Sequence, residues 1–262
     1  MIARRVALVT TSKGIGRAIA RALASDGCDI AVAYNADRTA ANACVAELKG
    51  LGANAEAFQA DVCRADQCQQ LVDSVIARFE RLDILVNAVG PFTRDRTLFG
   101  DYSVERIRNV LEGNLFSAMA LDSLALPYLR AGKAGRIIHF GFGRAGETPA
   151  WPQRAVYAAA KAGLVSLTKS LSVEESRNLI TVNMVCPGEI KGNAKEQLIA
   201  HARGLIDDEN PGMRPGTGED VARVVVFLCR AESDYITGTV IDVAGGLDPI
   251  RPLHSRLAKE PV

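Results

Sequence analysis

The sequence predicts a doubly wound α/β fold, in which a parallel sheet of about seven strands carries helices on both faces. Short apolar, β-branched runs alternate with longer stretches of helical periodicity along almost all of the 262 residues. The strand-like runs are apolar throughout, which is typical of parallel strands buried on both faces. Hydrophobic residues make up 48% of the chain, enough for the core of one large domain. Such a sheet binds ligands beyond the carboxyl ends of its strands.

The expected elements follow one another in regular alternation. The strands are short runs rich in valine, isoleucine, leucine and alanine, and they are predicted at residues 6–10, 30–34, 55–60, 83–87, 135–140, 179–185 and 239–243. Between them, apolar residues recur at helical spacing, which predicts helices at residues 14–25, 38–51, 65–80, 104–129, 155–175 and 219–229. These elements predict a single domain over residues 1–248.

Two segments stand apart from this alternation. Residues 191–215 form a polar stretch with several glycines and prolines, and we interpret them as a loop and helix that cover the substrate pocket as a lid. Residues 249–262 contain prolines and charges, and they predict an extended, peripheral C-terminal tail.

Charge and composition exclude several classes of protein. The net charge of +1 provides no field to gather nucleic acid or an anionic membrane, and no run of about 18 apolar residues exists to span a bilayer. The six cysteines form no CxxC pair and the three histidines are widely separated, so we expect free thiols and no metal site. These features predict a cytoplasmic protein that acts on a small molecule.

The most informative stretch of the sequence is Tyr157-Ala-Ala-Ala-Lys161, inside an alanine-rich helix. Four residues are just over one helical turn, so the phenol and the ammonium project from the same face. An ammonium near a phenol favours the phenolate, and we expect it to lower the pKa of the tyrosine. Such a tyrosine can donate a proton to a carbonyl oxygen that is being reduced. Taken alone, the pair also fits an aromatic core residue beside a solvated lysine.

A phosphate-binding turn is predicted after the first strand, at Lys13-Gly14-Ile15-Gly16. Its glycines let the backbone approach a pyrophosphate, and the helix that follows directs its free amides at the anion. The second strand ends at Tyr34 and Asn35, with no acid before Asp37 to bind a ribose diol. With the lysine of the turn and Arg38 nearby, this favours NADP(H). The alternative is that both cations are merely solvated.

These motifs and several others resemble the short-chain dehydrogenase/reductases, especially the 3-oxoacyl-(acyl carrier protein) reductase-like branch. The resemblance covers nearly the whole chain, from about Arg4 to Asp248. It rests on Val9 to Gly16, Asp61-Val62, Asn87-Ala88-Val89-Gly90, Asn114, Tyr157 with Lys161, Asn183 with Pro187-Gly188, Ile236-Thr237-Gly238 and Asp242 to Gly246. It implies a Rossmann fold, a nicotinamide cofactor, a small-molecule substrate such as an acyl thioester, and a homotetramer built on the long helices.

The resemblance implies a role for each matching residue. Tyr157 would be the general acid, Lys161 would hold the nicotinamide ribose, and Asn114 would hold a water that connects the lysine to solvent. The cofactor site is expected to comprise Thr10, Ser12, Lys13, Gly14, Ile15, Gly16, Tyr34, Asn35, Arg38, Asp61, Val62, Asn87, Ala88, Val89, Gly90, Tyr157, Lys161, Pro187, Gly188 and Ile190.

The sequence departs from the family pattern at four places. The phosphate loop is one residue short and lacks its leading glycine, Asn-Asn-Ala-Gly has become Asn87 to Gly90, and Gly192 stands in place of a threonine. The serine that shares the substrate carbonyl with the tyrosine is also missing. Alignment on the strand puts Phe142 in its place, and counting back from Tyr157 gives Arg144. Arg144 would replace the hydroxyl as a charged donor or face solvent, whereas Phe142 would form an apolar wall for a flat substrate.

Two classes of function remain open. The first is an NADPH-dependent reductase that converts a ketone or 3-oxoacyl carbonyl to an alcohol. In a related version the acceptor is a C=N bond in a flat heterocycle, as in pteridine reductases. The second is a non-catalytic NADP(H)-binding or sensing protein, which the short loop and the missing serine favour. The presence of Tyr157, Lys161 and Asn114 together favours the reductase.

Overall fold

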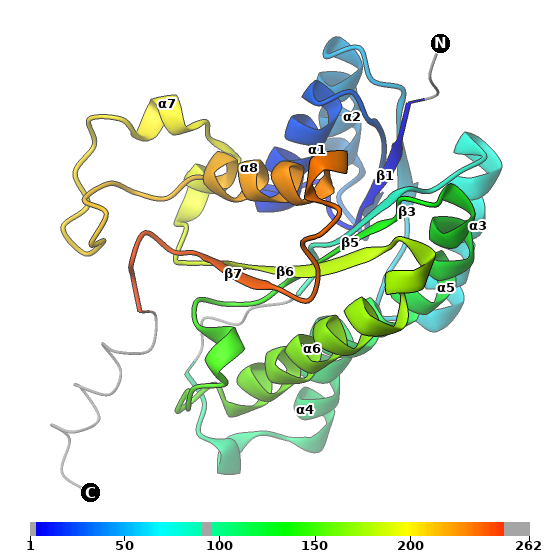
Figure 1. The fold of residues 1–262 in the computed structure, drawn as a ribbon. Coiled ribbons are helices and arrows are strands. Elements are labelled where there is room, and N and C mark those ends of the chain that lie inside the picture. Colours follow the sequence, from blue (N-terminus) through cyan, green and yellow to red (C-terminus); the bar gives the residue numbers. More distant parts are fainter. Residues whose placement is uncertain (1–3, 91–95, 249–262) are drawn as a thin grey trace, which may run out of the picture.

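The computed structural model describes residues 4–90 and 96–248, and they form one seven-stranded sheet in which all neighbouring strands are parallel (Figure 1). The strands are β1 Val6–Val9, β2 Asp29–Tyr34, β3 Ala55–Gln59, β4 Ile84–Asn87, β5 Arg136–Phe140, β6 Thr181–Pro187 and β7 Val240–Val243. Their order is β3-β2-β1-β4-β5-β6-β7. The predicted fold class is confirmed. The expected C-terminal tail, 249–262, lies outside the described residues.

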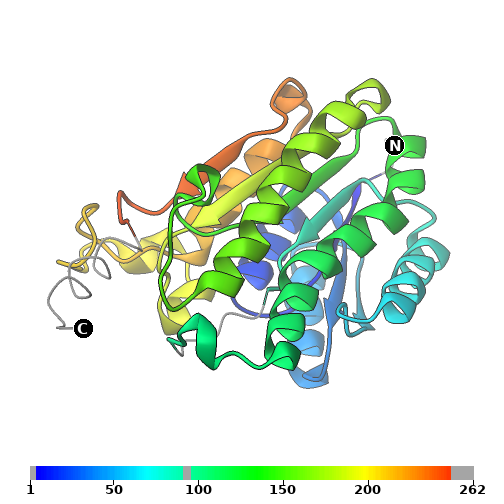
Figure 2. The same ribbon diagram turned by 90° about the horizontal axis from the view of Figure 1, so that it is seen from below.

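Helices cover both faces of the sheet. They are α1 Gly14–Ser25, α2 Arg38–Gly50, α3 Ala65–Phe79, α4 Val104–Leu111, α5 Ser117–Gly132, α6 Ala155–Glu174, α7 Ile199–Ala202 and α8 Gly218–Cys229. Helices α1, α2 and α8 lie on one face, and α3, α5 and α6 lie on the other (Figures 1 and 2).

Neighbouring residues of one strand belong to different cores. In β1, Ala7 and Val9 pack in the cluster beneath α1 and α8, whereas Leu8 packs in the cluster beneath α3 and α5. Side chains of a strand point alternately to its two faces, so a sheet covered on both faces needs apolar residues at every position. This explains why the strands show no polar alternation in the sequence.

The chain is helical throughout the predicted range 104–129, but the helix is not regular, because a π turn divides it. The chain forms α4, then a π-helical turn, Glu112–Phe116 (η2), and then α5. Asn114 lies in this turn, and its Nδ2 atom donates a 3.1 Å hydrogen bond to the Val110 carbonyl. A π turn inserts into an α-helix without changing the helical pattern on either side of it, and such turns are frequent at functional sites. The turn packs against α6.

The segment predicted as a lid contains little helix. A 3₁₀ turn, Gly192–Glu196 (η5), precedes the four-residue α7, and most of the remaining segment is irregular. The turn η5 packs against both α1 and α8. At the start of α8, a Cβ on Gly218 would lie 1.9 Å from the Lys195 carbonyl oxygen, so only glycine permits this contact.

The strand order places the candidate site. The order reverses between β1 and β4, and in open α/β sheets the crevice at such a point binds the ligand. Thr10 joins the loops that follow these two strands, because its Oγ1 atom accepts hydrogen bonds from the Ala88 and Val89 amides at 2.9 and 3.1 Å. The side chain of Thr10 is therefore part of the scaffold of the crevice.

Candidate active site

Tyr157 and Lys161 lie on one face of α6, as their spacing predicts. The Lys161 Nζ atom is 5.8 Å from the centroid of the tyrosine ring. Lys161 is only 3% exposed. No carboxylate of the described residues pairs with it, and a buried ammonium of this kind is costly in a purely structural position, which points to a chemical role.

Gly90, in the loop after β4, is the meeting point of the predicted catalytic residues. A Cβ on Gly90 would lie 2.8 Å from Asn114 Oδ1 and 3.1 Å from Lys161 Nζ, so a larger residue would displace one of them. The β4 loop, the π turn and α6 thus bring the side chains of Asn114 and Lys161 to one place beside Tyr157. The structure brings the three residues together, and their catalytic roles stay predictions.

Burial governs the acid–base behaviour of this group. It raises the pKa of Tyr157 above the ordinary value of a phenol, with a smaller rise from Cys186 and a small decrease from Arg154. It lowers the pKa of Lys161 from 10.5 to about 8. The expectation that Lys161 lowers the tyrosine pKa is therefore wrong, because the desolvation of the phenolate dominates. Tyr157 is protonated at neutral pH, which is the form that donates a proton.

We expect the burial of Lys161 to make stability depend on pH. Its folded-state pKa of about 8 lies below the ordinary 10.5, so between these values the unfolded chain binds a proton that the folded chain does not. The contribution of Lys161 to the free energy of unfolding should therefore rise with pH across this window, by up to about 3 kcal/mol. The raised pKa values of Tyr157 and the buried cysteines act in the opposite direction over part of the same window, so the contribution is measured as a difference between two proteins. Urea unfolding of the cofactor-free protein and of Lys161→Met on both sides of the window gives this difference. The same dependence on pH in the two proteins would contradict the prediction.

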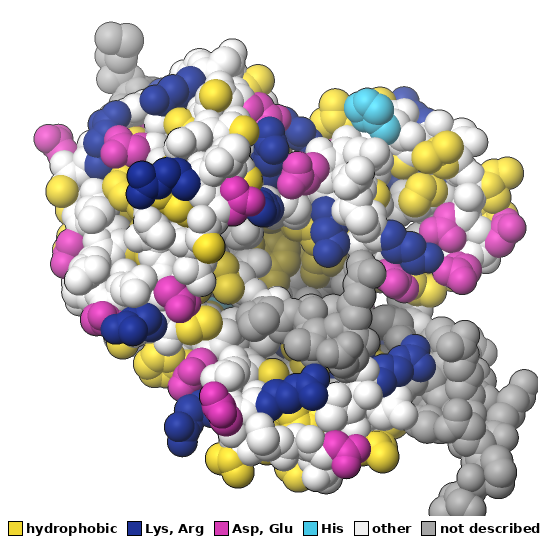
Figure 3. All heavy atoms as spheres, turned by 180° about the vertical axis from the view of Figure 1, so that it is seen from behind, with side chains coloured by type: hydrophobic (Ala, Val, Ile, Leu, Met, Phe, Trp, Pro, Cys, Tyr) yellow, Lys and Arg dark blue, Asp and Glu magenta, His cyan; other side chains and the backbone are white. Residues whose placement is uncertain are grey.

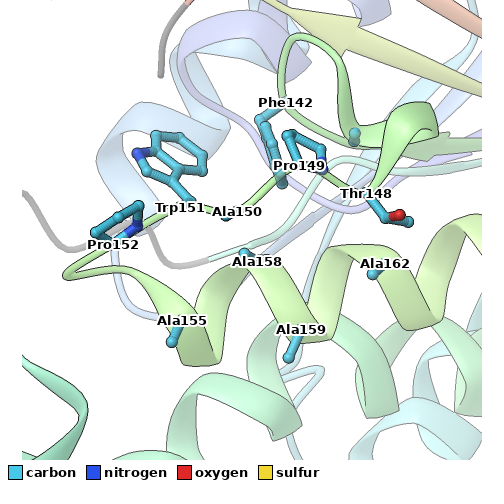
Figure 4. A pocket seen from close by; sticks show the side chains of 11 residues that line it. Phe142, Thr148, Pro149, Ala150, Trp151, Pro152, Ala155, Ala158, Ala159 and Ala162 are labelled. Atoms are coloured by element: carbon cyan, nitrogen blue, oxygen red, sulfur yellow. The ribbon is translucent and has the colours of Figure 1, made fainter. Parts of the chain in front are cut away.

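An aromatic cluster stands where the family serine is expected. Phe142 is 7% exposed, and its ring centroid lies 4.5 Å from that of Trp151 and 5.9 Å from that of Tyr157. Figure 4 shows Phe142 and Trp151 on the loop after β5, opposite alanines of α6 such as Ala158. Between loop and helix lies a groove of about 430 Å³. The sequence carries no signal that Trp151 joins this cluster.

Arg144 is engaged by two carboxylates. Its Nε and Nη2 atoms donate to Glu147 at 3.0 and 2.6 Å, and its Nη1 pairs with Asp248. These partners raise the pKa of the guanidinium. The backbone of Arg144 has a φ of 68°, and its amide donates to Asp242 at 3.0 Å. Of the two candidates for the place of the serine, Phe142 is the one that packs on Tyr157.

The glycines of the predicted phosphate turn are required by its geometry. Gly14 has a φ of +58°, in the region that favours glycine, and a Cβ on Gly16 would lie 2.2 Å from the Thr11 Cγ2 atom. The Gly14 amide, at the start of α1, donates a 2.7 Å hydrogen bond to Glu196 Oε1 of η5. Sequence reasoning missed Glu196, because one acid in a polar segment is no signal.

The other predicted cofactor residues lie along the carboxyl edge of the sheet. Beyond the end of β2, Lys13 forms an ion pair with Asp37, and Arg38 donates to Gln59 Oε1 at 3.4 Å. The Lys13–Asp37 pair is about half-exposed, so its net contribution to stability is small. Ile15 lies in the first turn of α1, and at or just after the ends of their strands lie Ser12, Tyr34, Asn35, Asp61, Val62, Asn87, Ala88, Val89, Pro187, Gly188 and Ile190.

Asn87 belongs to a buried hydrogen-bonded chain that sequence reasoning missed. Its Nδ2 atom donates to Asp122 Oδ1 at 2.8 Å, and the other oxygen of Asp122 lies 2.8 Å from His139 Nε2. The His139 Nδ1 atom lies 2.8 Å from Thr168 Oγ1 on α6. This series of hydrogen bonds links β4, α5, β5 and α6, so it fixes the helix of Tyr157 relative to the β4 loop.

The residues at this edge fit a nicotinamide dinucleotide. A carboxylate oxygen of Glu196 already binds the Gly14 amide, where the phosphate of a dinucleotide would accept a hydrogen bond. The Oδ1 atom of Asn87 is buried and has no hydrogen-bond partner among the described residues. Within residues 4–90 and 96–248, no group of three His, Cys, Asp or Glu side chains is placed to hold a metal ion. In the same residues, no helix is both long and apolar enough to cross a membrane.

A doubly wound parallel sheet, a glycine turn after β1 and a Tyr–Lys–Asn group at the carboxyl edge define an oxidoreductase of the Rossmann type. The family model described as enoyl-(acyl carrier protein) reductase matches residues 9–248. The chain belongs to the short-chain dehydrogenase/reductase family.

Individual relatives agree with this assignment. The chain is 39% identical over 248 residues to "Putative oxidoreductase YtkK" of Bacillus subtilis (strain 168), covering 94% of this chain and 97% of that protein. It is 36% identical over 244 residues to the 3-oxoacyl-(acyl-carrier-protein) reductase FabG of Staphylococcus aureus (strain Mu50), covering 92% and 97%. A blue fluorescent protein from a metagenomic library, solved in complex with NADPH, is similar in structure. Its TM-score is 0.80 at 31% identity, over 92% of this chain and 97% of that chain.

Proposed function

We propose that this protein is an NADPH-dependent reductase that converts a carbonyl group, of ketone or 3-oxoacyl type, to an alcohol. The observation that carries the proposal is the convergence of Lys161 Nζ and Asn114 Oδ1 at Gly90, beside the ring of Tyr157. Burying a lysine and an asparagine here costs free energy, and apolar side chains would fill the same space without that cost. The 3-oxoacyl substrate class is suggested by the similarity to FabG.

In this mechanism the residues of the protein donate the proton and position the reactants. The bound cofactor would supply the hydride. Tyr157, kept protonated by its raised pKa, donates a proton to the carbonyl oxygen. The pKa of Lys161, about 8, lies close to the working pH. Asn114 lies beside Lys161, on the route that we propose for the next proton. Phe142 offers no second donor in place of the family serine, so Tyr157 is the donor that we propose for the developing negative charge.

The phosphorylated cofactor is favoured by the charges at the end of β2. Asp37 is the first acid after this strand in the sequence, and it is already engaged as the N-cap of α2, accepting from the Ala40 amide at 2.9 Å. It also pairs with Lys13. Because that pair is exposed and weak, Lys13 can exchange it for a 2′-phosphate, with Arg38 nearby. The structural neighbour that binds NADPH supports the same choice.

We expect the purified protein to oxidise NADPH when offered β-ketoacyl thioesters, diketones or quinones, and to bind NADPH more tightly than NADH. The loss of NADPH absorbance measures turnover, and calorimetric titration measures both affinities. Tight NADPH binding without turnover on any substrate would instead favour the non-catalytic binder. Turnover restricted to flat C=N heterocycles would favour the version that is similar to pteridine reductases. Tighter binding of NADH would overturn the cofactor assignment.

The homotetramer is also part of the proposal, with α5 and α6 as the contact helices. On α6, Ala160 is fully buried against the body of the protein, whereas Ala155 and Ala159 are exposed and line the groove of Figure 4. Phe116 and Met119, at the start of α5, are also exposed. Exposed apolar surface of this kind is typical of a face that another subunit covers.

A further inference from the structure

We propose that the carboxylate of Glu196 occupies the diphosphate site of this protein and that cofactor binding must displace it. The inference rests on the proposed binding of NADP(H), and it adds a residue that sets the affinity for the cofactor. It starts from one contact, the 2.7 Å hydrogen bond from the Gly14 amide to Glu196 Oε1. The two residues are 182 positions apart in the sequence.

The start of α1 attracts an anion. Its N-cap residue, Lys13, makes no side-chain hydrogen bond to the first turn, and that turn contains no acidic residue. The amides at the beginning of a helix lack acceptors within the helix, and they carry partial positive charge. In this structure the acceptor for the Gly14 amide comes from η5.

Two arginines of α1 hold Glu196 at this position. The Arg17 Nη1 atom lies 3.4 Å from Glu196 Oε2, and Arg21 Nη2 donates to the Glu196 carbonyl at 3.0 Å. Both arginines also bind Glu47 of α2, at 2.8 and 3.3 Å. The two arginines thus share two carboxylates, and of these Glu196 is the one that binds the first amide of the helix.

The turn that carries Glu196 is packed on the body of the protein. Ala194 contacts the core cluster beneath α1, and the Lys195 carbonyl lies against Gly218 at the start of α8. Figure 1 shows this segment after β6, next to α1 and α8. Figure 3 shows a hollow between this body and the lobe formed by the lid, with acidic and basic side chains around it. The contact of Glu196 is thus supported by the packing of η5 on α1 and α8.

Two anions cannot share the Gly14 amide. A diphosphate at the start of α1 would meet the like charge of Glu196 and would compete for the same N–H group. The carboxylate therefore has to withdraw before the cofactor binds, and this movement couples binding to the position of the lid. NADPH and NADH carry the same diphosphate, so the effect on both should be equal.

Glu196→Gln keeps the shape of the side chain and removes its charge, and it should bind NADPH roughly tenfold more tightly than the unmodified protein. NADH should gain the same factor. Titration calorimetry measures both, and the fluorescence of Trp151, the only tryptophan of the chain, provides a second readout. Neither readout depends on turnover.

Glu47→Gln is the matched control. It removes the same charge from Arg17 and Arg21 but has no contact with the Gly14 amide, so its affinity should stay within about twofold. Unchanged or weaker binding by Glu196→Gln would overturn the inference, and so would an equal gain in Glu47→Gln. If neither the unmodified protein nor the variants bind NADPH or NADH, the proposed function is wrong, and so is the inference that rests on it.

Discussion

Tyr157→Phe should lower kcat by a factor of roughly 10² to 10⁴ while NADPH affinity and stability stay nearly unchanged. The substitution removes the hydroxyl that α6 places beside Lys161, and Phe142 on the neighbouring loop cannot replace it as a proton donor. The ring itself remains, so its contacts with Phe142 and Trp151, both at 5.9 Å between centroids, are kept. Steady-state kinetics, NADPH titration and thermal unfolding of the same preparation measure the three quantities.

The matched control for this prediction is Tyr235→Phe. Tyr235 is 98% exposed, so the loss of its hydroxyl should change neither turnover nor stability. Turnover that persists in Tyr157→Phe would remove the tyrosine from its role as the acid. A fall in stability as large as the fall in rate would assign the hydroxyl to the fold instead.

The fold could be predicted from the sequence because each strand is buried on both faces. Ala7, Leu8 and Val9 contact two different cores, so the run is apolar at every position, and its short length distinguishes it from a helix. The π turn between α4 and α5 could not be predicted in this way. The π turn that holds Asn114 leaves the apolar periodicity on both sides unchanged, so the pattern indicates one helix.

The candidate site was predictable where it depends on local spacing. Tyr157 and Lys161 share a helix face because they are four residues apart, and no other part of the chain has to be known. Glu196 and Gly14 meet only through the packing of η5 on α1, which no local pattern encodes. The pKa of Tyr157 was mispredicted for a related reason. Its direction depends on burial by other segments rather than on its neighbour in the helix.

Arg144 and Phe142 illustrate the same limit at the position of the missing serine. Counting along the sequence leaves both residues as candidates. The backbone at Arg144 is left-handed, and its side chain pairs with Glu147 and Asp248. Phe142, in contrast, packs on Tyr157. A loop conformation of this kind follows from tertiary contacts, so alignment alone leaves the choice open.

Phe142→Ala should lower the free energy of unfolding by about 3 kcal/mol, which corresponds to a decrease in Tm of roughly 6–12 °C. The ring is 7% exposed and packs between Trp151 and Tyr157, so its removal leaves a cavity in the cluster. The groove beside Phe142 is open to solvent, and water entering from it places the expected loss at the lower end of the range for buried phenylalanine. Urea and thermal unfolding measure the loss.

Phe99→Ala is the control for the removal of a ring. Phe99 is 63% exposed, so its loss should change the free energy of unfolding by no more than about 0.5 kcal/mol. An equally small change in Phe142→Ala would show that the aromatic cluster is not a packed unit, and the apolar wall beside Tyr157 would then lose its structural basis. Phe142→Ala should thus lower stability, whereas Tyr157→Phe should lower turnover, because the first removes packing and the second removes the hydroxyl that donates the proton. Phe142→Ser would lose the same ring. Any gain in turnover from its hydroxyl therefore has to be measured well below the reduced Tm of that variant.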